Sequence, residues 1–202
     1  MNDFTLKTYN ESAEKLATYF SGIGARTDDI IKAFSLVREA DDLNILELGC
    51  GDGRDAAAIA PMVRTYLGTD YSNELLKIAQ SRNLKNATFQ CADMRSFDFN
   101  SHKPVDIIFA FASLLHLSKS EIAQVFSDST TAIKSGGIWY ISLKYGESYR
   151  KEIKEDEYGS RLFYFYTPDE VALVAGDAFT EVYRDFQTVG STKWFTLALR
   201  KT

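Results

Sequence analysis

A glycine-rich segment flanked by acids carries the clearest chemical signal in this sequence. Glu47-Leu48-Gly49-Cys50-Gly51-Asp52-Gly53 follows a short apolar run and precedes an alanine-rich stretch, as expected for a strand, a turn and a helix. Glycine at alternate positions lets the backbone turn tightly and lets a ligand approach it closely. We therefore expect this segment to bind part of a small ligand through its backbone.

Two ligand classes fit such a loop, and its charges favour one of them. Residues 51–56, Gly-Asp-Gly-Arg-Asp-Ala, also match the dinucleotide pattern G-x-G-x-x-A, which holds a pyrophosphate at a helix N-terminus. The carboxylates of Glu47, Asp52 and Asp55 would repel a pyrophosphate, and Arg54 alone opposes them in this stretch. S-adenosylmethionine carries a positive sulfonium, a positive ammonium and a single carboxylate, so an acidic loop with one arginine complements it. The sequence favours that ligand over a nicotinamide or flavin dinucleotide.

Two further acids stand where predicted strands end. Asp70 closes a predicted strand at 65–70, and Asp93 follows another at 88–91. A carboxylate at the first position can accept both ribose hydroxyls of an adenosine, and one at the second could accept from an adenine amino group. Either acid could instead cap a helix. Because Glu47 stands at the end of the strand before them, a ligand shared by all three is the favoured interpretation.

The elements that would bring these residues together alternate between strand and helix. Helical spacing of apolar residues predicts two helices before the glycine loop, at 8–20 and 27–39. The alternation indicates a doubly wound α/β fold with right-handed crossovers, which binds ligands at the carboxyl ends of its strands. The predicted strands are 43–48, 65–70, 88–91, 105–111 and 138–143, followed by a closing hairpin of 179–186 and 193–199.

Together these motifs resemble the class I S-adenosylmethionine-dependent methyltransferases, over essentially residues 5–202. Residues 47–53 match the family's first motif, E/D-x-G-x-G-x-G, and Cys91-Ala92-Asp93-Met94 matches its adenine-side segment. Asp106-Ile107-Ile108-Phe109-Ala110, with Leu114-Leu115-His116-Leu117 after it, is similar to the fourth strand, and Gly136-Gly137 to the turn before the fifth.

The resemblance implies a single methyltransferase domain over residues 1–202, with a helical cap at 1–40. Its fold would be a Rossmann-like sheet of seven strands, mostly parallel with an antiparallel C-terminal strand, and with helices on both faces. Ser142-Leu143-Lys144-Tyr145-Gly146-Glu147 and Tyr164-Phe165-Tyr166-Thr167 are similar to a group of small bacterial methyltransferase-domain proteins, most of which have no assigned substrate.

The resemblance also implies which residues would hold S-adenosylmethionine. The loop backbone and Glu47 would bind the methionine end, with Arg54 on its carboxylate and the Ala110 carbonyl on its ammonium. Asp70 would bind the ribose and Asp93 the adenine. The expected cofactor-binding residues are Tyr9, Glu47, Gly49, Cys50, Gly51, Arg54, Asp70, Tyr71, Asp93, Met94 and Ala110.

His116 is the candidate for acid–base chemistry. Methyl transfer from a sulfonium depends mainly on alignment and needs a base only if the nucleophile arrives protonated. His116 follows the fourth predicted strand and has a pKa class suited to neutral pH, but it could instead cap or pack at the start of the helix after Ser118. Some family members carry an asparagine just after this strand, where Phe111 stands here, so amine methylation that relies on such a residue is not supported.

Residues 146–166 form the one stretch without a clear pattern, charged at first and aromatic at its end. We expect this segment, with Tyr9, to be a mobile cover over the substrate pocket, because the chain leaving the fifth strand must pass beside the ligand. Tyr9 resembles a tyrosine that closes over the cofactor in related enzymes. The alternatives are that Tyr9 only packs between helices and that the phenylalanines of 146–166 only anchor the segment. Candidate substrate residues are Lys144, Tyr145, Arg161 and Tyr164.

Composition narrows the setting and the partners. A chain of 202 residues fits one α/β domain, and a net charge of −5 without a long basic run counts against duplex nucleic acid as a partner. Two cysteines far apart and two histidines predict no metal site and a reduced, cytoplasmic setting. The first ten residues do not resemble a signal peptide, and no apolar run approaches the ~20 residues that span a membrane. We expect a small-molecule substrate and a monomer or homodimer.

Three functions stay open on the sequence. The favoured one is methyl transfer to a small molecule whose identity and acceptor atom the sequence does not reveal. The second is a non-catalytic protein of the same fold that binds S-adenosylmethionine or S-adenosylhomocysteine. The third, disfavoured by the acidic loop, is an NAD-dependent oxidoreductase.

Overall fold

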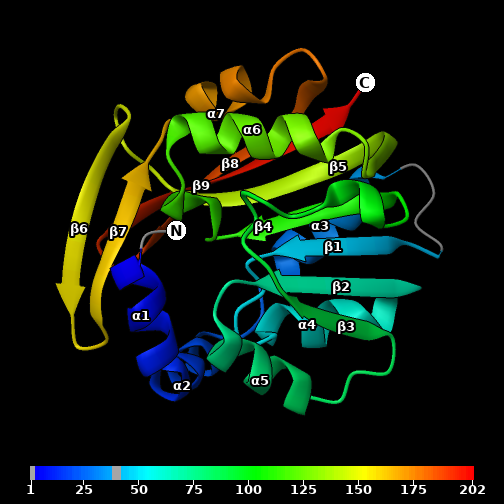
Figure 1. Cartoon of the computed structure of the whole chain (residues 1–202). Coiled ribbons are helices and arrows are strands. Elements are labelled where there is room, and N and C mark those ends of the chain that lie inside the picture. Colours follow the sequence, from blue (N-terminus) through cyan, green and yellow to red (C-terminus); the bar gives the residue numbers. More distant parts are fainter. Residues whose placement is uncertain (1–2, 38–41) are drawn as a thin grey trace.

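The apolar run before the glycine loop forms β1, near the centre of a seven-stranded sheet in the computed structural model, which describes residues 3–37 and 42–202 (Figure 1). The strand order is β3-β2-β1-β4-β5-β9-β8, and β9 alone runs opposite to the other strands of this sheet. The predicted sheet, with its antiparallel C-terminal strand, is confirmed. Its strands are β1 (Asn44–Leu48), β2 (Thr65–Asp70), β3 (Ala87–Cys91), β4 (Val105–Phe111), β5 (Ile133–Lys144), β8 (Phe179–Val189) and β9 (Thr192–Lys201).

Helices cover both faces of this sheet, as predicted. The expected helix at 8–20 is in fact two, because the chain turns at Ser12 between α1 and α2. The helix expected at 27–39 ends at Leu36, and residues 38 and 39 lie outside the described part of the chain. The α-helices are α1 (Asp3–Glu11), α2 (Ala13–Ile23), α3 (Thr27–Leu36), α4 (Arg54–Ile59), α5 (Asn73–Ser81), α6 (Lys119–Ser129) and α7 (Pro168–Ala175), with short 3₁₀ turns η1 (Ala60–Met62), η2 (Phe99–Ser101) and η3 (Leu114–His116).

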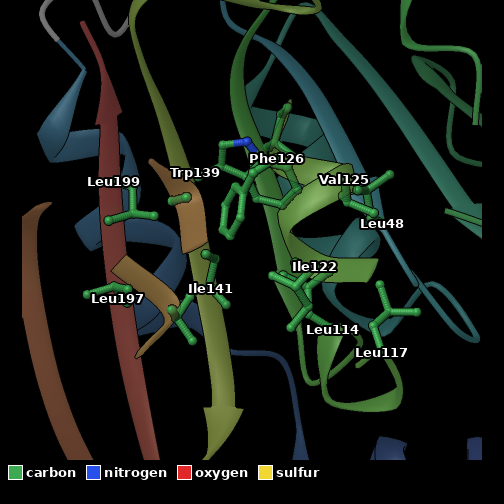
Figure 2. Packing of buried hydrophobic residues seen from close by; sticks show 14 of the residues in the cluster. Leu48, Leu114, Leu117, Ile122, Val125, Phe126, Trp139, Ile141, Leu197 and Leu199 are labelled. Carbon is green, nitrogen blue, oxygen red and sulfur yellow. The ribbon is translucent and has the colours of Figure 1, made fainter. Parts of the chain in front are cut away.

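Each face of the sheet carries its own apolar core. On one face, α6 and α7 pack over β4, β5 and β9, and Trp139, Phe126 and Ile122 are fully buried there (Figure 2). On the other face, Ile30 of α3 and Ile59 of α4 lie against the opposite side of the same strands. This alternation of buried side chains fixes which face each strand residue takes. Because β1, β2 and β4 run parallel, their carboxyl ends lie at one edge of the sheet.

The stretch expected to be irregular is a β-hairpin. Strands β6 (Arg150–Asp156) and β7 (Gly159–Phe165) pair antiparallel and lie apart from the main sheet, beside α1 (Figure 1). Phe163 and Phe165 on β7 are buried in the core of the α6 face. In β7, burial alternates from residue to residue, since Phe163 and Phe165 are buried and Tyr164 between them is half-buried. The many charged residues of β6 hide this strand pattern in the sequence.

Helix α1 holds this hairpin through hydroxyl groups on one of its faces. Thr5 Oγ1 accepts from the Leu162 amide at 2.9 Å, and Thr8 Oγ1 donates to the Ser160 carbonyl at 2.8 Å. Ser12 Oγ donates to the Tyr158 carbonyl at 2.7 Å. Thr5 and Thr8 share a face of α1 and Ser12 follows at the turn after it, whereas 158, 160 and 162 are alternate residues along the hairpin, so helix and strand run side by side over this length.

Among the helices of the described residues, none is both long and apolar enough to cross a lipid bilayer.

A buried hydrogen bond inside the core allows a test of this packing. Trp139 Nε1 donates to Ser129 Oγ at 3.0 Å, and both residues are inaccessible to solvent. Ser129→Ala leaves the indole N–H without an acceptor, so we expect the free energy of unfolding to fall by about 1–3 kcal/mol. Urea unfolding measures it. The exposed Ser127→Ala on the same helix should change little, and Ser129→Ala in a Trp139→Phe background should cost less. Equal losses in both backgrounds would contradict a role for this bond.

Candidate functional site

The glycine loop turns sharply at the end of β1 because it packs directly against the end of β4. Gly49 has a φ of +78°, and a Cβ placed there would lie 2.3 Å from the Ser113 Cβ. Ser113 Oγ in turn donates to the Leu48 carbonyl at 2.6 Å. Gly51 also has a positive φ, +57°, but a Cβ there would meet nothing within 4 Å. The loop is therefore packed tightly at Gly49 and open at Gly51, where a ligand can approach the backbone.

Asp70 is oriented toward this open part of the loop by backbone amides. Its Oδ2 accepts from the Gly51 amide and its Oδ1 from the Ser72 amide, each at 2.8 Å. Burial raises the pKa of Asp70, while these two amides act in the opposite direction. Each carboxylate oxygen keeps a second lone-pair site, so Asp70 can still accept from two vicinal hydroxyls. Its geometry fits the ribose of an adenosine ligand.

The acids of the loop are compensated by three arginines, and the expectation that Arg54 alone opposes them is wrong. Asp55 Oδ2 binds Arg54 Nη2 at 2.7 Å and Arg26 Nη1 at 2.8 Å. Asp52 binds Arg82 Nη2 at 2.5 Å. Although burial alone raises the pKa of Asp55, the two arginines hold it below its ordinary value.

Consequently, the loop does not repel a pyrophosphate through free carboxylates. Instead, each of the arginines that approach it already binds an acid, so none of the three is left to neutralise a pyrophosphate. The preference against a dinucleotide stands, for a different reason from the one that the sequence suggested. Arg54, expected on the ligand carboxylate, points to Asp55.

Glu47 lies beneath the loop and is only 1% exposed. Its Oε2 accepts from the Tyr66 hydroxyl at 2.5 Å. Burial, followed by the charge of Asp55, raises the pKa of Glu47 to about 8. The residue expected to hold the methionine end thus contributes a largely protonated carboxyl that is bonded to the core.

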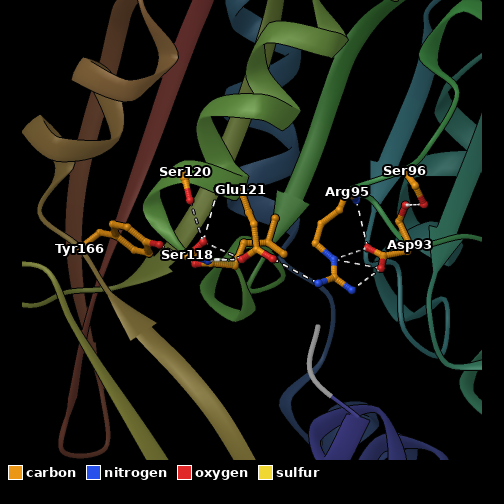
Figure 3. A network of polar contacts seen from close by, with 8 residues as sticks. Asp93, Arg95, Ser96, Ser118, Ser120, Glu121 and Tyr166 are labelled. Atoms are coloured by element: carbon orange, nitrogen blue, oxygen red, sulfur yellow. Dashed lines mark hydrogen bonds and ion pairs between the residues drawn. The ribbon is translucent and has the colours of Figure 1, made fainter.

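Asp93 is part of a polar network that joins the end of β3 to the start of α6 (Figure 3). Its two carboxylate oxygens bind the Arg95 guanidinium, and Arg95 Nη1 lies 3.1 Å from Glu121 Oε1. Glu121 completes the capping box of α6 with Ser118. Arg95 thereby fixes the orientation of Asp93 at the sheet edge where the adenine was expected.

The other expected cofactor residues lie around the same edge. Met94 is packed beside Gly49, since a Cβ on that glycine would come 3.6 Å from Met94 Cε. Cys50 is buried under the loop, Ala110 is buried within β4, and Tyr71 is partly exposed after β2.

His116 ties the N-terminal helix to the hairpin. Its Nδ1 lies 2.7 Å from the Leu162 carbonyl and its Nε2 lies 2.8 Å from the Tyr9 hydroxyl. A carbonyl can only accept, so Nδ1 carries the proton and Nε2 accepts from Tyr9. Burial lowers the pKa of His116 to about 3 and raises that of Tyr9, so both groups are neutral at pH 7.

The structure brings two of the four candidate substrate residues to His116. Lys144 Nζ lies 3.7 Å from the centre of the Phe163 ring, Arg161 Cζ lies 5.5 Å from it, and the His116 ring lies 5.0 Å from it. Tyr145 instead contacts Phe186 and lines a shallow pocket of about 370 Å³ with it.

The fourth candidate, Tyr164, stacks on Tyr149. The four side chains therefore do not form one cluster.

Some residues of the site carried no signal in the sequence. Arg26 and Arg82 reach the loop from 29 and 30 residues away, and Ser113 supports it from 65 residues away. Asn10 Oδ1 accepts from the Ser72 hydroxyl at 2.7 Å and so joins α1 to the start of α5. For Asn10 alone there was a usable hint, its position next to Tyr9.

Comparisons with known proteins agree with this geometry. Residues 45–137 match the family model of the methyltransferase domain. Phosphoethanolamine N-methyltransferase 1 of Caenorhabditis elegans is 27% identical over 134 residues, which make up 65% of this chain and 26% of that protein. The chain thus spans about a quarter of the length of the curated relative it matches.

Solved structures share the fold. An S-adenosylmethionine-dependent methyltransferase from Methanosarcina mazei is 17% identical, with a TM-score of 0.70 over 80% of this chain and 93% of that one. The complex of DhpI with S-adenosylhomocysteine is 18% identical, with a TM-score of 0.69 over 98% of this chain and 95% of that one. At these identities the likeness establishes the fold alone.

The buried imidazole predicts how stability depends on pH. Below the ordinary histidine pKa of ~6.5, His116 binds a proton in the unfolded chain, whereas in the folded protein it stays neutral until the pH nears 3. This group therefore lowers the free energy of unfolding as the pH falls, by about 2 kcal/mol between pH 7.5 and 5.0. Urea unfolding at both pH values should show a loss smaller by that amount in His116→Gln.

The same substitution at the other histidine, His102→Gln, supplies the matched control. Glu47, whose pKa is raised, changes stability in the opposite sense, but it is present in every variant and cancels in the comparison. An unchanged pH dependence in His116→Gln would mean that the folded protein protonates His116 as readily as the unfolded chain does.

Proposed function

We propose that this chain, whose residues 45–137 match the methyltransferase domain model, is a class I S-adenosylmethionine-dependent methyltransferase that transfers a methyl group to a small-molecule acceptor. The observation that carries the proposal is Asp70, which two backbone amides orient beside the open part of the glycine loop. The relative from Caenorhabditis elegans, whose name states a small amine as acceptor, supports a small molecule.

The residues of the sheet edge fit the parts of this cofactor. Asp70 would accept from the ribose hydroxyls, Asp93 would face the adenine, and the Gly51 backbone would lie against the methionine end. Met94 offers apolar surface beside Gly49. When bound, S-adenosylmethionine supplies an electrophilic methyl group on its sulfonium.

We assign to the protein the work of alignment and of excluding water. Orientation of two reactants contributes up to ~7–11 kcal/mol to such a displacement. Tyr9 and the hairpin strand β7 meet over the sheet edge through His116, and this contact would close the site around the reactants. We infer that His116 acts by holding Tyr9 in place, because both of its ring nitrogens are engaged and its pKa is lowered to about 3.

A non-catalytic cofactor-binding protein is the second candidate. The hydrogen bonds of His116 favour it, because a histidine with both ring nitrogens engaged supplies no ready base. Methyl transfer to an unprotonated nucleophile needs none, however, so turnover of a metabolite pool with S-adenosylmethionine separates the two candidates. Location in the cytoplasm and the oligomeric state stay predictions.

Calorimetry tests the cofactor. We expect S-adenosylmethionine and S-adenosylhomocysteine to bind and NAD not to bind. Asp70→Ala should weaken the binding of S-adenosylhomocysteine by about 1.5–3 kcal/mol, or roughly 10- to 150-fold in Kd, because two ribose hydroxyls lose a charged acceptor.

Asp128→Ala, an exposed acid on α6, is the matched control and should bind as the wild type does. Far-ultraviolet circular dichroism confirms that each variant is folded. Tight binding of NAD, or an unchanged Kd in a folded Asp70→Ala protein, would reject the proposed site.

Hydrogen exchange tests the cover. If residues 146–166 close over the ligand, their amides should gain protection when S-adenosylhomocysteine binds. Thr8→Val removes one hydroxyl that holds the hairpin, so exchange in the ligand-free variant should be faster than in the wild type. Equal protection with and without the ligand would instead make the hairpin a fixed wall of the pocket.

A further inference from the structure

One face of the β6–β7 hairpin is lined with charges. Residues directly opposite each other in an antiparallel pair share a face, so Glu152, Lys154 and Asp156 lie on the same face as Arg161 and Phe163. Asp156 binds the Arg161 guanidinium, and Glu152 lies 3.7 Å from Lys154 Nζ. The acids on this face are therefore already engaged by cations of the hairpin itself.

Lys144 adds a cation to this face without a carboxylate of its own. It stands at the end of β5, half-buried, with its Nζ over the Phe163 ring at 3.7 Å and 5.7 Å from the Trp194 ring. In the part of the chain that the structure describes, it forms no ion pair with a carboxylate; the nearby Glu152 and Asp156 act on its charge but pair with cations of the hairpin. Burial, together with the charges of Lys154 and Arg161, lowers the pKa of Lys144 to about 8.

Arg161 presents a second unused donor at the same place. Its side chain is 11% exposed, and its Nε is buried without a hydrogen-bond partner among the described residues. A buried N–H left unpaired is costly, so this donor calls for an acceptor, which a ligand can supply. Arg161 Cζ lies 5.5 Å from the Phe163 ring that Lys144 also covers, and 5.7 Å from the Tyr9 ring.

We propose that Lys144 and Arg161 together bind an oxyanion, a phosphate or carboxylate group, on the methyl acceptor. The inference rests on the proposed function, because it assigns a chemical class to the acceptor of that reaction. The anionic end of the acceptor then lies against Phe163, and its nucleophile extends past Tyr9 toward the glycine loop. An otherwise acidic protein, with a net charge of −5, gains a local positive field that attracts this substrate class.

The alternative is that Lys144 and Arg161 only pack on aromatic rings as cations. That interpretation accounts for Lys144 but leaves Arg161 Nε without an acceptor. It also predicts no preference for oxyanions over other anions, which makes the two interpretations separable.

A fluorescence titration decides between them. Trp139 is fully buried, so Trp194 beside Lys144 is the tryptophan placed to respond. Inorganic phosphate and acetate, titrated at constant ionic strength against chloride, stand for the two oxyanion sources. Each titration is run with and without saturating S-adenosylhomocysteine. We expect saturable binding of phosphate, acetate or both, and none of chloride. The anion that binds more tightly shows whether the acceptor carries a phosphate or a carboxylate group.

Substitutions locate the response. Lys144→Gln and Arg161→Gln should each raise the Kd of the oxyanion about 10- to 100-fold, since each removes a charged donor. Arg161→Lys, which keeps the charge without the Nε donor, should also weaken it and guards against misfolding of the glutamine variant. Lys151→Gln removes a charge from the opposite face of the hairpin and should change nothing.

Two results would overturn the proposal: no saturable response beyond that of chloride, or equal binding in wild type, Lys144→Gln and Arg161→Lys. Neither depends on the cofactor, because the titration without S-adenosylhomocysteine reads the anion alone. Failure of S-adenosylhomocysteine to bind would instead count against the proposed function and leave the anion result standing.

Discussion

The neutral imidazole of His116 is the contact on which the covered site depends. It receives a hydrogen bond from Tyr9 on α1 and gives one to Leu162 on β7, so that a single ring holds two segments more than a hundred residues apart over the sheet edge. A charged imidazolium would have to be buried beside Lys144 and Arg161, and both of these charges oppose its protonation. The ring therefore stays neutral, and its two nitrogens keep distinct roles as donor and acceptor.

Charge compensation decides which acid is free to meet a ligand. Four acids surround the glycine loop, and in three of them the charge is neutralised: Asp52 and Asp55 bind arginines, and Glu47 carries a raised pKa beside Tyr66. Asp70 is held by amides instead, which orient its oxygens without neutralising them. The loop is acidic in sequence, but of these four acids the one oriented by backbone amides is Asp70, which is placed for a ribose.

The sequence predicted the sheet and the loop because both depend on local patterns. Apolar runs followed by glycines mark strand ends, and a parallel sheet necessarily gathers those ends at one edge. The hairpin was missed because the charges of β6 masked its alternation, although in β7 the buried Phe163 and Phe165 do flank the half-buried Tyr164. The ion pairs of Arg26 and Arg82 were also missed, since a contact that spans about thirty residues leaves no trace in local spacing. The expected site residues could be named, but whether each faces a ligand or the core is decided by such distant partners.

The docking of α1 on β7 has a consequence for the order of folding. The three hydroxyl contacts join residues 146 to 157 positions apart, whereas the strand pairs of the central sheet close much shorter loops. Closing a long loop costs entropy before any contact is gained, so such contacts form late. During synthesis on the ribosome, α1 must wait for most of the chain to emerge before it finds its partner strand. Strands β1 to β5 precede the hairpin in the chain and can therefore pair first with their ligand edge uncovered, so that cofactor present at that stage could bind before the cover is in place.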